Sequence, residues 1–358
     1  MSSNNYPTSN FYGQKKELIS NIFQYVPAET RTFVDLFSGS SVVSWNAKQR
    51  GHQVLASDVM LYPVIRFRAL VENDDVLLSD SDLDMLAAPN VDRQDWCVRW
   101  YGAALGLDNA KFIDLLAANA LRLDDPRKAD IVIYVAVLTI MQHMHYCSVK
   151  FSPTGEFSGW RDLDDFFLPD EFRDYTAKQF PSFIFATGIQ HRAEQSDALD
   201  YLDTIPQADV LYCDSPYSSP ASQYAAQYAF YDKISLILLG KANLVITPCS
   251  GKPPMPAHVN FANREQSLAG FGQLFWRASR NCRRIIVSYN KTSSISPDQI
   301  THIGKLHFGD RVAYEEIPTS NTTTSRFANR NPAEVIMVFD NRNPPANQFR
   351  NTTAHVAA

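Results

Sequence analysis

The sequence lacks the features that mark secreted and membrane-spanning proteins. Its five cysteines are odd in number and widely scattered, with no CxxC pair to suggest zinc binding or redox exchange. The longest apolar stretch, Ile131 to Met141, is about half of the roughly 20 residues that cross a bilayer. The N-terminus has neither a basic region nor an apolar core. We therefore expect a cytoplasmic protein without a secretory signal.

An excess of positive charge is also missing. The chain has 33 lysines and arginines against 38 aspartates and glutamates, a net charge of -5. This balance argues against an indiscriminate polyanion binder, although nucleic-acid contact depends on local basic faces and not on the sum. What is present is an ordinary globular composition, 358 residues of which 45% are hydrophobic, which excludes disordered and collagen-like classes.

Apolar runs and turns near both ends of the chain predict a parallel α/β sheet. A run from Thr32 to Phe37 is followed by a small-residue turn, a helical stretch to Gly51 and a second run from Gln53 to Ser57. Strand, turn, helix and strand in this order open such a sheet. Further strands are predicted at Val210 to Cys213, Asn243 to Thr247, Arg284 to Tyr289, Arg311 to Ile317 and Glu334 to Phe339.

The middle of the chain has a different pattern. Residues 61–185 contain helical segments and then a polar, glycine-punctuated stretch, Tyr146 to Ser158, that predicts a β-hairpin. We therefore predict a sheet domain formed by residues 1–60 and 186–340, a helical and hairpin lobe over 61–185, and a flexible tail over 341–358.

Two short segments could carry chemistry. The first, Asp35 to Ser40, is a small-residue turn after a strand, and Asp58 ends the next strand nineteen residues beyond Gly39. In an α/β sheet this turn lies at the edge where ligands bind, and such an acid can accept hydrogen bonds from ribose hydroxyls. A plain structural turn is the alternative for this segment alone.

The second segment is Asp214-Ser215-Pro216-Tyr217, directly after an apolar run. Its carboxylate could take hydrogen bonds from an amino group while the tyrosine ring stacks on a flat base. For the tetrapeptide in isolation, a turn capped by aspartate is the alternative.

Together these segments resemble the N6-adenine DNA methyltransferases of the D12 (DNA adenine methylase) class. FVDLFSGS is similar to that family's S-adenosylmethionine motif, and VLYCDSPYSS to its catalytic Asp-Pro-Pro-Tyr motif. Three further matches lie along the chain in the order that the family has. Phe11 to Lys15 resembles the first cofactor segment, Asp197 the acid that meets the cofactor's adenine, and Tyr146 to Ser158 the hairpin of the target-recognition domain.

The resemblance implies roles for individual residues. The implied catalytic residues are Asp214, Ser215, Pro216 and Tyr217. The implied S-adenosylmethionine-binding residues are Tyr12, Gly13, Lys15, Asp35, Phe37, Ser38, Gly39, Ser40, Asp58 and Asp197. DNA contacts are implied for Lys150, Phe151 and Ser152, and no metal site is expected.

The activity implied is that of a site-specific adenine DNA methyltransferase, which rotates an adenine out of duplex DNA and methylates its N6 atom. The implied fold is a Rossmann-like, seven-stranded sheet that ends in an antiparallel hairpin and carries an inserted, mostly helical target-recognition lobe. The implied partners are double-stranded DNA and a cognate restriction endonuclease acting on the same sequence. Methylation of cytosine N4 or of RNA adenine, and a catalytically weakened DNA-binding homologue, are the alternatives.

Two residues depart from the family's pattern. Ser41 replaces a glycine and would crowd the cofactor side unless its backbone stays at negative φ. Ser215 stands where the family usually has proline, which leaves the backbone carbonyl in place but makes the turn less rigid. Elsewhere, a group of arginines could follow a phosphate backbone or form a solvated face: Arg277, Arg280, Arg283 and Arg284.

Overall fold

A computed structural model describes most of the chain, namely residues 6–7, 15–143, 150–151, 157–158, 167–216, 222–245, 261, 263–291, 293, 295–318 and 333–341. Four predicted site residues lie outside these ranges: Tyr12, Gly13, Ser152 and Tyr217. So does nearly all of the predicted flexible tail, residues 342–358. Within the described ranges, no helix combines the length and apolar character needed to span a bilayer.

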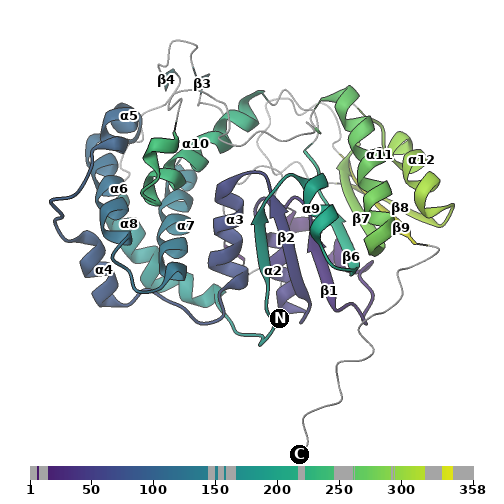
Figure 1. The fold of residues 1–358 in the computed structure, drawn as a ribbon, viewed down its shortest axis with the longest axis horizontal. Helices are drawn as coiled ribbons and strands as arrows, with labels where there is room; N and C mark the ends of the chain where they lie inside the picture. The colour runs from purple at the N-terminus through teal and green to yellow at the C-terminus, as the bar shows by residue number, and fades with distance from the viewer. Residues whose placement is uncertain are drawn as a thin grey trace, which may run out of the picture. The chain divides into compact units, whose positions relative to one another are not determined.

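The scaffold is a mixed sheet of seven strands (Figure 1). Its order is β5-β2-β1-β6-β7-β9-β8. The parallel pairs β2–β5 and β6–β7 contrast with β9, which is antiparallel to both β7 and β8. The strands are β1 (Thr32–Asp35), β2 (Gln53–Asp58), β5 (Arg192–Gln195), β6 (Ala208–Cys213), β7 (Cys282–Asn290), β8 (Val312–Pro318) and β9 (Ala333–Asp340). The predicted α/β fold and its antiparallel last hairpin are confirmed.

Two details of the strand prediction were wrong. The segment Arg192–Gln195 forms β5 at the edge of the sheet, although its polar sequence gives no strand-like alternation. In place of the predicted strand beginning at Asn243, residues Ala242–Leu244 form the 3-10 helix η6. Ala242 and Val245 are buried there whereas Leu244 is exposed. Residues 246–247 of the predicted strand lie outside the described ranges.

The chain forms two compact units. The first comprises residues 1–20, 35–197 and 219–258, and the second comprises 21–34, 198–218 and 259–358. The first unit contains most of the helices: η2 (Lys16–Leu18), α2 (Val42–Gln49), α3 (Leu61–Phe67), η3 (Arg68–Glu72), α4 (Asp80–Ala87), α5 (Trp96–Leu105), α6 (Leu107–Ala120), α7 (Pro126–His143), α8 (Leu168–Asp174), η4 (Tyr175–Gln179), η5 (Phe180–Phe183) and α10 (Ser222–Leu238). The short helix α1 (Ile19–Phe23) joins the two units in sequence.

Helix α7 forms the core of the helical part of the first unit. Every residue from Ile131 to Met141 is buried, and the helix contacts α3, α6, α8 and α10 (Figure 1). This packing explains why α7 is apolar on all sides. Beyond α7, β3 (Lys150–Phe151) pairs antiparallel with β4 (Phe157–Ser158), which confirms the predicted hairpin.

The second unit packs helices on its sheet through a tight glycine contact. It contains α9 (Ala198–Thr204), α11 (Arg264–Asn281) and α12 (Pro297–Phe308), and α12 contacts both α11 and β9. A Cβ atom at Gly304 of α12 would overlap the ring of Phe339 on β9. That ring is itself held by Phe275, with ring centres 4.8 Å apart. Only glycine therefore fits at position 304.

We expect Gly304→Ala to lower the free energy of unfolding by about 1 to 3 kcal/mol, the usual cost of overpacking a core. Gly272→Ala on α11 is the matched control, because no described atom lies within 4 Å of the position that its Cβ would take. Urea unfolding of the two variants measures the difference. Equal stability of both would contradict the close contact.

Candidate active site

The loop after β1 is held against the end of β2 by a carboxylate. The amide of Gly39 donates to Asp58 Oδ2 at 3.0 Å, and the amide of Met60 donates to Oδ1 at 2.9 Å. The amide of Ser38 also donates to the carbonyl oxygen of Ser57 at 3.0 Å. The small-residue turn is therefore fixed to the strand that ends at the predicted ribose-binding acid.

Burial raises the pKa of two carboxyl groups near the end of β2. Burial raises the pKa of Asp58 to about 6, and the backbone N–H donors act in the opposite direction. Asp232 of α10, which the sequence did not single out, accepts the amides of Leu61 and Tyr62 at 3.0 and 2.9 Å. Burial raises the pKa of Asp232 to about 7, and the charge of Asp58 adds to that rise. Burial therefore favours the protonated form of both carboxyls.

Asp197 lies at the same edge of the sheet as Asp58. In the parallel pairing of β2 with β5, Asp58 is opposite Gln195, and Asp197 follows two residues later. The amide of Ser196 donates to the carbonyl oxygen of Asp58 at 3.0 Å, which ties the two strand ends together. The structure therefore brings together two acids that are far apart in the sequence.

The remaining predicted cofactor residues are largely buried in the first unit. Asp35 accepts a hydrogen bond from Ser44 Oγ of α2 at 2.6 Å, so one of its oxygens holds the helix that follows the loop. Lys15 and Ser40 are buried, and Phe37 is half-buried. Asp35 thus has a structural contact that the motif alone did not indicate.

The backbone at Ser41 has a positive φ, whereas a negative φ was expected if the serine is not to crowd the cofactor side. Its φ is 56°, the one non-glycine residue with positive φ in the described part of the chain. The amide of Ser41 donates to the carbonyl oxygen of Ser38 at 2.6 Å, and its own carbonyl oxygen accepts the amide of Trp45 at 2.9 Å. This turn into α2 requires the left-handed conformation that glycine adopts without cost.

In the second unit, Asp214 follows the end of β6. Ser288 Oγ on β7 donates to Asp214 Oδ1 at 3.1 Å, and the Tyr212 hydroxyl lies 2.8 Å from Ser288 Oγ. Because the Ser288 hydrogen is used toward Asp214, the tyrosine must donate to the serine. Sequence reasoning missed Ser288, since only the pairing of Cys213 with Val287 places it there.

The two residues after Asp214 differ in exposure. Ser215 is completely buried, whereas Pro216 is exposed. The Oγ atom of Ser215 has no hydrogen-bond partner among the residues that the structure describes. The hydroxyl of Ser215 is therefore buried without a partner in the described ranges, at the position where the resemblance puts a proline.

Most arginines of the group in the second unit form ion pairs with aspartates. Three of the four residues are bound to carboxylates: Arg277 to Asp203, Arg283 to Asp209 and Arg284 to Asp340. The fourth, Arg280, lies over the ring of Trp276, 5.0 Å from its centre. The group ends at the start of β7. Arg283 lies beside Asp209 at the start of β6, five residues before Asp214, which is about 17 Å at about 3.3 Å per residue. This geometry favours the solvated face over a phosphate track beside Asp214.

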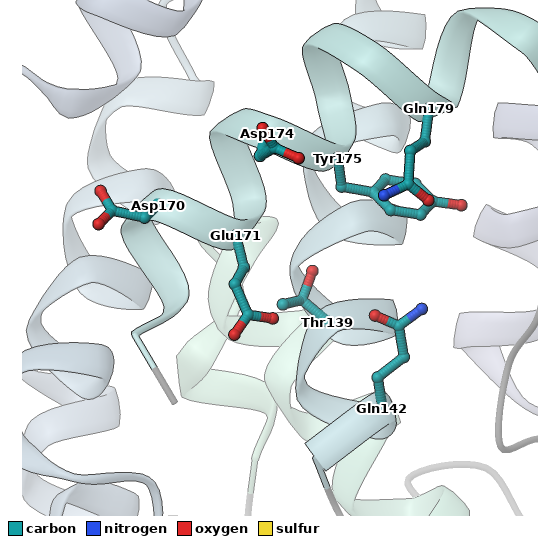
Figure 2. Close-up of a pocket in the computed structure, with 7 residues that line it drawn as sticks. All are labelled: Thr139, Gln142, Asp170, Glu171, Asp174, Tyr175 and Gln179. Atoms are coloured by element: carbon teal, nitrogen blue, oxygen red, sulfur yellow. The ribbon is translucent and has the colours of Figure 1, made fainter. Parts of the chain in front are cut away.

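A cavity of about 370 Å³ lies between α7 and α8 in the first unit (Figure 2). Its seven lining residues include Asp170, Glu171 and Asp174 but no lysine or arginine. Figure 2 shows Glu171 extending from α8 toward Thr139 of α7, and Glu171 Oε2 lies 2.6 Å from His143 Nε2. The acidic lining disfavours a DNA phosphate in this cavity. Within the described ranges, no cluster of three or more histidines, cysteines or acids could hold a metal ion.

Comparison with known proteins places the chain in a family. The model of the D12 class N6 adenine-specific DNA methyltransferase family matches residues 11–237, more than half of the chain. The chain belongs to this family. It is therefore an adenine-specific DNA methyltransferase by family, and the resemblance carried by FVDLFSGS and VLYCDSPYSS is confirmed.

Individual relatives are distant. The methyltransferase is 23% identical over 355 residues to the Type II methyltransferase M2.HphI of Haemophilus parahaemolyticus, covering 96% of this chain and 100% of that protein. It is 23% identical over 352 residues to the modification methylase StsI of Streptococcus sanguinis, covering 88% of this chain and 50% of that protein. A solved structure described as a SAM-dependent methyltransferase from Streptococcus mutans matches with a TM-score of 0.35 and 10% identity over 91% of this chain and 48% of that chain.

We expect Ser41→Gly to raise the free energy of unfolding by about 1 kcal/mol, because glycine removes the left-handed strain. Ser41→Ala is the matched control: it keeps the Cβ atom but removes an Oγ that has no hydrogen-bond partner within the described residues. Thermal unfolding of both variants separates backbone strain from the buried hydroxyl. A glycine variant less stable than the wild type would show that strain at Ser41 is unimportant.

Proposed function

We propose that this methyltransferase transfers a methyl group from S-adenosylmethionine to N6 of an adenine in duplex DNA, with Asp214 holding the target amine. The observation that carries the proposal is the Asp214 carboxylate, which ends a buried strand and is oriented by Ser288. A carboxylate fixed in this way presents a directed acceptor to an amino group.

The first unit has the chemistry expected of the cofactor's site. The family to which the chain belongs uses S-adenosylmethionine, which supplies an electrophilic sulfonium methyl group. Asp58 fits ribose hydroxyls because it is a carboxylate at the end of the second strand, beside a glycine that lets a ligand approach the backbone. Asp197 fits the amino group of the cofactor's adenine. Tyr12, Gly13, Lys15, Asp35, Phe37, Ser38 and Ser40 complete the proposed cofactor set.

Asp214 and the backbone carbonyl of Ser215 would hold the two hydrogens of the target N6 atom. These hydrogen bonds draw the nitrogen lone pair out of conjugation with the ring and aim it at the methyl group. Most of the acceleration is then positional, for which well-oriented systems gain roughly 7 to 11 kcal/mol. No strong base is required, because the nitrogen loses its proton readily once it carries positive charge.

DNA binding would use the hairpin and the tyrosine of the catalytic segment. Rotating the adenine out costs a few kcal/mol, which stacking on Tyr217 would offset. Lys150, Phe151 and Ser152 are proposed DNA contacts, and the antiparallel pairing of Lys150 with Ser158 supports a hairpin at this place. A cytoplasmic location and a cognate restriction endonuclease acting on the same sequence are part of the proposal. Two relatives are named as a Type II methyltransferase and a modification methylase, which is compatible with such a partner.

We expect Asp214→Ala to abolish DNA methylation while the dissociation constant of S-adenosylmethionine changes by less than about twofold, because the carboxylate binds the target amine and not the cofactor. Asp203→Ala, which removes an acid of the same unit that is paired with Arg277, should leave turnover unchanged. Methylation of duplex DNA and calorimetric titration of the cofactor measure the two effects. Turnover of Asp214→Ala within about tenfold of the wild type would remove Asp214 from the mechanism.

The affinity for S-adenosylmethionine should fall by up to about tenfold for each pH unit below 6, because Asp58, whose pKa is raised to about 6, then becomes protonated. Because the pKa of Asp58 is higher in the folded than in the unfolded protein, the folded state binds this proton more tightly. The contribution of Asp58 to the free energy of unfolding therefore falls as the pH rises from 3.8 to about 6. Asp58→Asn should weaken binding and flatten the pH dependence.

Asp114→Asn is the matched control for this titration. Burial raises the pKa of Asp114 to about 6 as well, but this acid accepts the amides of Cys97 and Val98 at the start of α5. Calorimetry between pH 5 and pH 8 should show an unaltered profile for the control. If the profile of Asp58→Asn matches that of the wild type, Asp58 does not bind the ribose.

A further inference from the structure

Arg66 on α3 is a completely buried arginine surrounded by tyrosine rings. Its guanidinium carbon lies 5.4 Å from the ring centre of Tyr6 and 5.7 Å from that of Tyr134. Its Nε atom donates to the Tyr6 hydroxyl oxygen at 3.2 Å. A buried cation is retained only where its contacts compensate for the lost hydration. Hydrogen bonding to a phenol oxygen and contact with aromatic faces both provide such compensation.

Tyr6 connects this arginine to the candidate cofactor loop. Its hydroxyl donates to the backbone carbonyl oxygen of Ser40, and its ring packs edge-to-face on Trp45 of α2, with ring centres 5.4 Å apart. Only 2% of Tyr6 is exposed. Tyr6 precedes residues 11–237, the part of the chain that the family model matches, so the match assigns it no role.

The arginine determines the direction of the tyrosine's hydrogen bond. A guanidinium can only donate, so the phenol oxygen accepts from Arg66 and must turn its own hydrogen toward another acceptor. That acceptor is the carbonyl of Ser40. Burial raises the pKa of Tyr6, so the hydroxyl keeps its proton. Two hydrogen bonds in series also polarise and strengthen each other.

The carbonyl that Tyr6 binds belongs to the peptide between Ser40 and Ser41. The N–H of the same peptide donates to the carbonyl oxygen of Ser38. Both polar atoms of this peptide are therefore fixed, directly before the residue with φ of 56°. Asp58 holds the other end of the loop through Gly39. A loop fixed at both ends loses little conformational entropy when a ligand binds.

We propose that Arg66 and Tyr6 form a clamp that presets the loop of Ser38, Gly39 and Ser40 for S-adenosylmethionine. Both are positioning residues, since they act on the loop through the Ser40 carbonyl. The proposal rests on the proposed function, in which this loop binds the cofactor.

The test removes the Tyr6 hydroxyl and keeps its ring. Tyr6→Phe should raise the dissociation constant and KM for S-adenosylmethionine about five- to tenfold, the range that one lost hydrogen bond produces, with kcat within about twofold. Arg66→Lys should act in the same direction, because it removes the Nε–H that orients the phenol. Calorimetry and DNA methylation assays on the full chain measure both quantities.

Tyr134→Phe is the matched control, because Tyr134 is equally buried, faces the same guanidinium, and has its hydroxyl 3.3 Å from that of Tyr175. It should leave cofactor binding unchanged even if its melting temperature falls as much as that of Tyr6→Phe. An equal loss of affinity in the two tyrosine variants, or no loss in Tyr6→Phe, would overturn the clamp.

Two further measurements separate failure of the clamp from failure of the proposed function. If the wild type binds S-adenosylmethionine and Asp58→Asn weakens it while Tyr6→Phe does not, the clamp is wrong and the function stands. If the wild type does not bind the cofactor, hydrogen exchange of residues 36–44 without ligand decides. Tyr6→Phe should then speed exchange in this segment and Tyr134→Phe should not, whereas equal exchange overturns the clamp.

Discussion

The hydrogen bonds of the Asp58 carboxylate are the contacts on which the candidate cofactor site depends. Through Gly39 and Met60 they join the loop after β1 to the chain that leaves β2. At the start of the next helix, α3, a backbone amide donates to a second carboxylate, that of Asp232. The same helix contains Arg66. Asp58 is half-buried, whereas Asp232 and Arg66 are almost completely buried. Each has a desolvation cost that its hydrogen bonds must offset, which is common where a protein builds a binding site.

The sequence predicted those candidate site residues that stand beside a recognisable strand or turn. Asp58 and Asp214 were predicted because the first ends a strand and the second directly follows one. Tyr6 and Ser288 could not be predicted, because they act on residues 34 and 74 positions away and carry no distinctive neighbours. The edge strand β5 was missed for a related reason. It is four residues long and polar, so its strand conformation comes from pairing with β2 and not from its own sequence.

The two departures from the family's motifs share a physical feature. Ser41 and Ser215 are both completely buried, and neither Oγ atom has a hydrogen-bond partner in the described part of the chain. Each such hydroxyl costs about 1 to 3 kcal/mol. At both positions, however, the atom that matters is in the backbone: the amide of Ser41 closes the turn into α2, and the carbonyl of Ser215 is the proposed acceptor. The serines therefore reduce stability without removing the backbone groups that the site needs.

The position of β9 between β7 and β8 has a consequence for how the chain is made. Seven residues of β7, from Arg284 to Asn290, pair with β9, which lies close to the end of the chain at Ala333–Asp340. During synthesis on the ribosome, β7 is complete some forty residues before its partner emerges. In that interval it exposes an unpaired, apolar strand edge of the kind that joins other chains. We therefore expect nascent or truncated forms that end before β9 to aggregate more readily than the complete sheet.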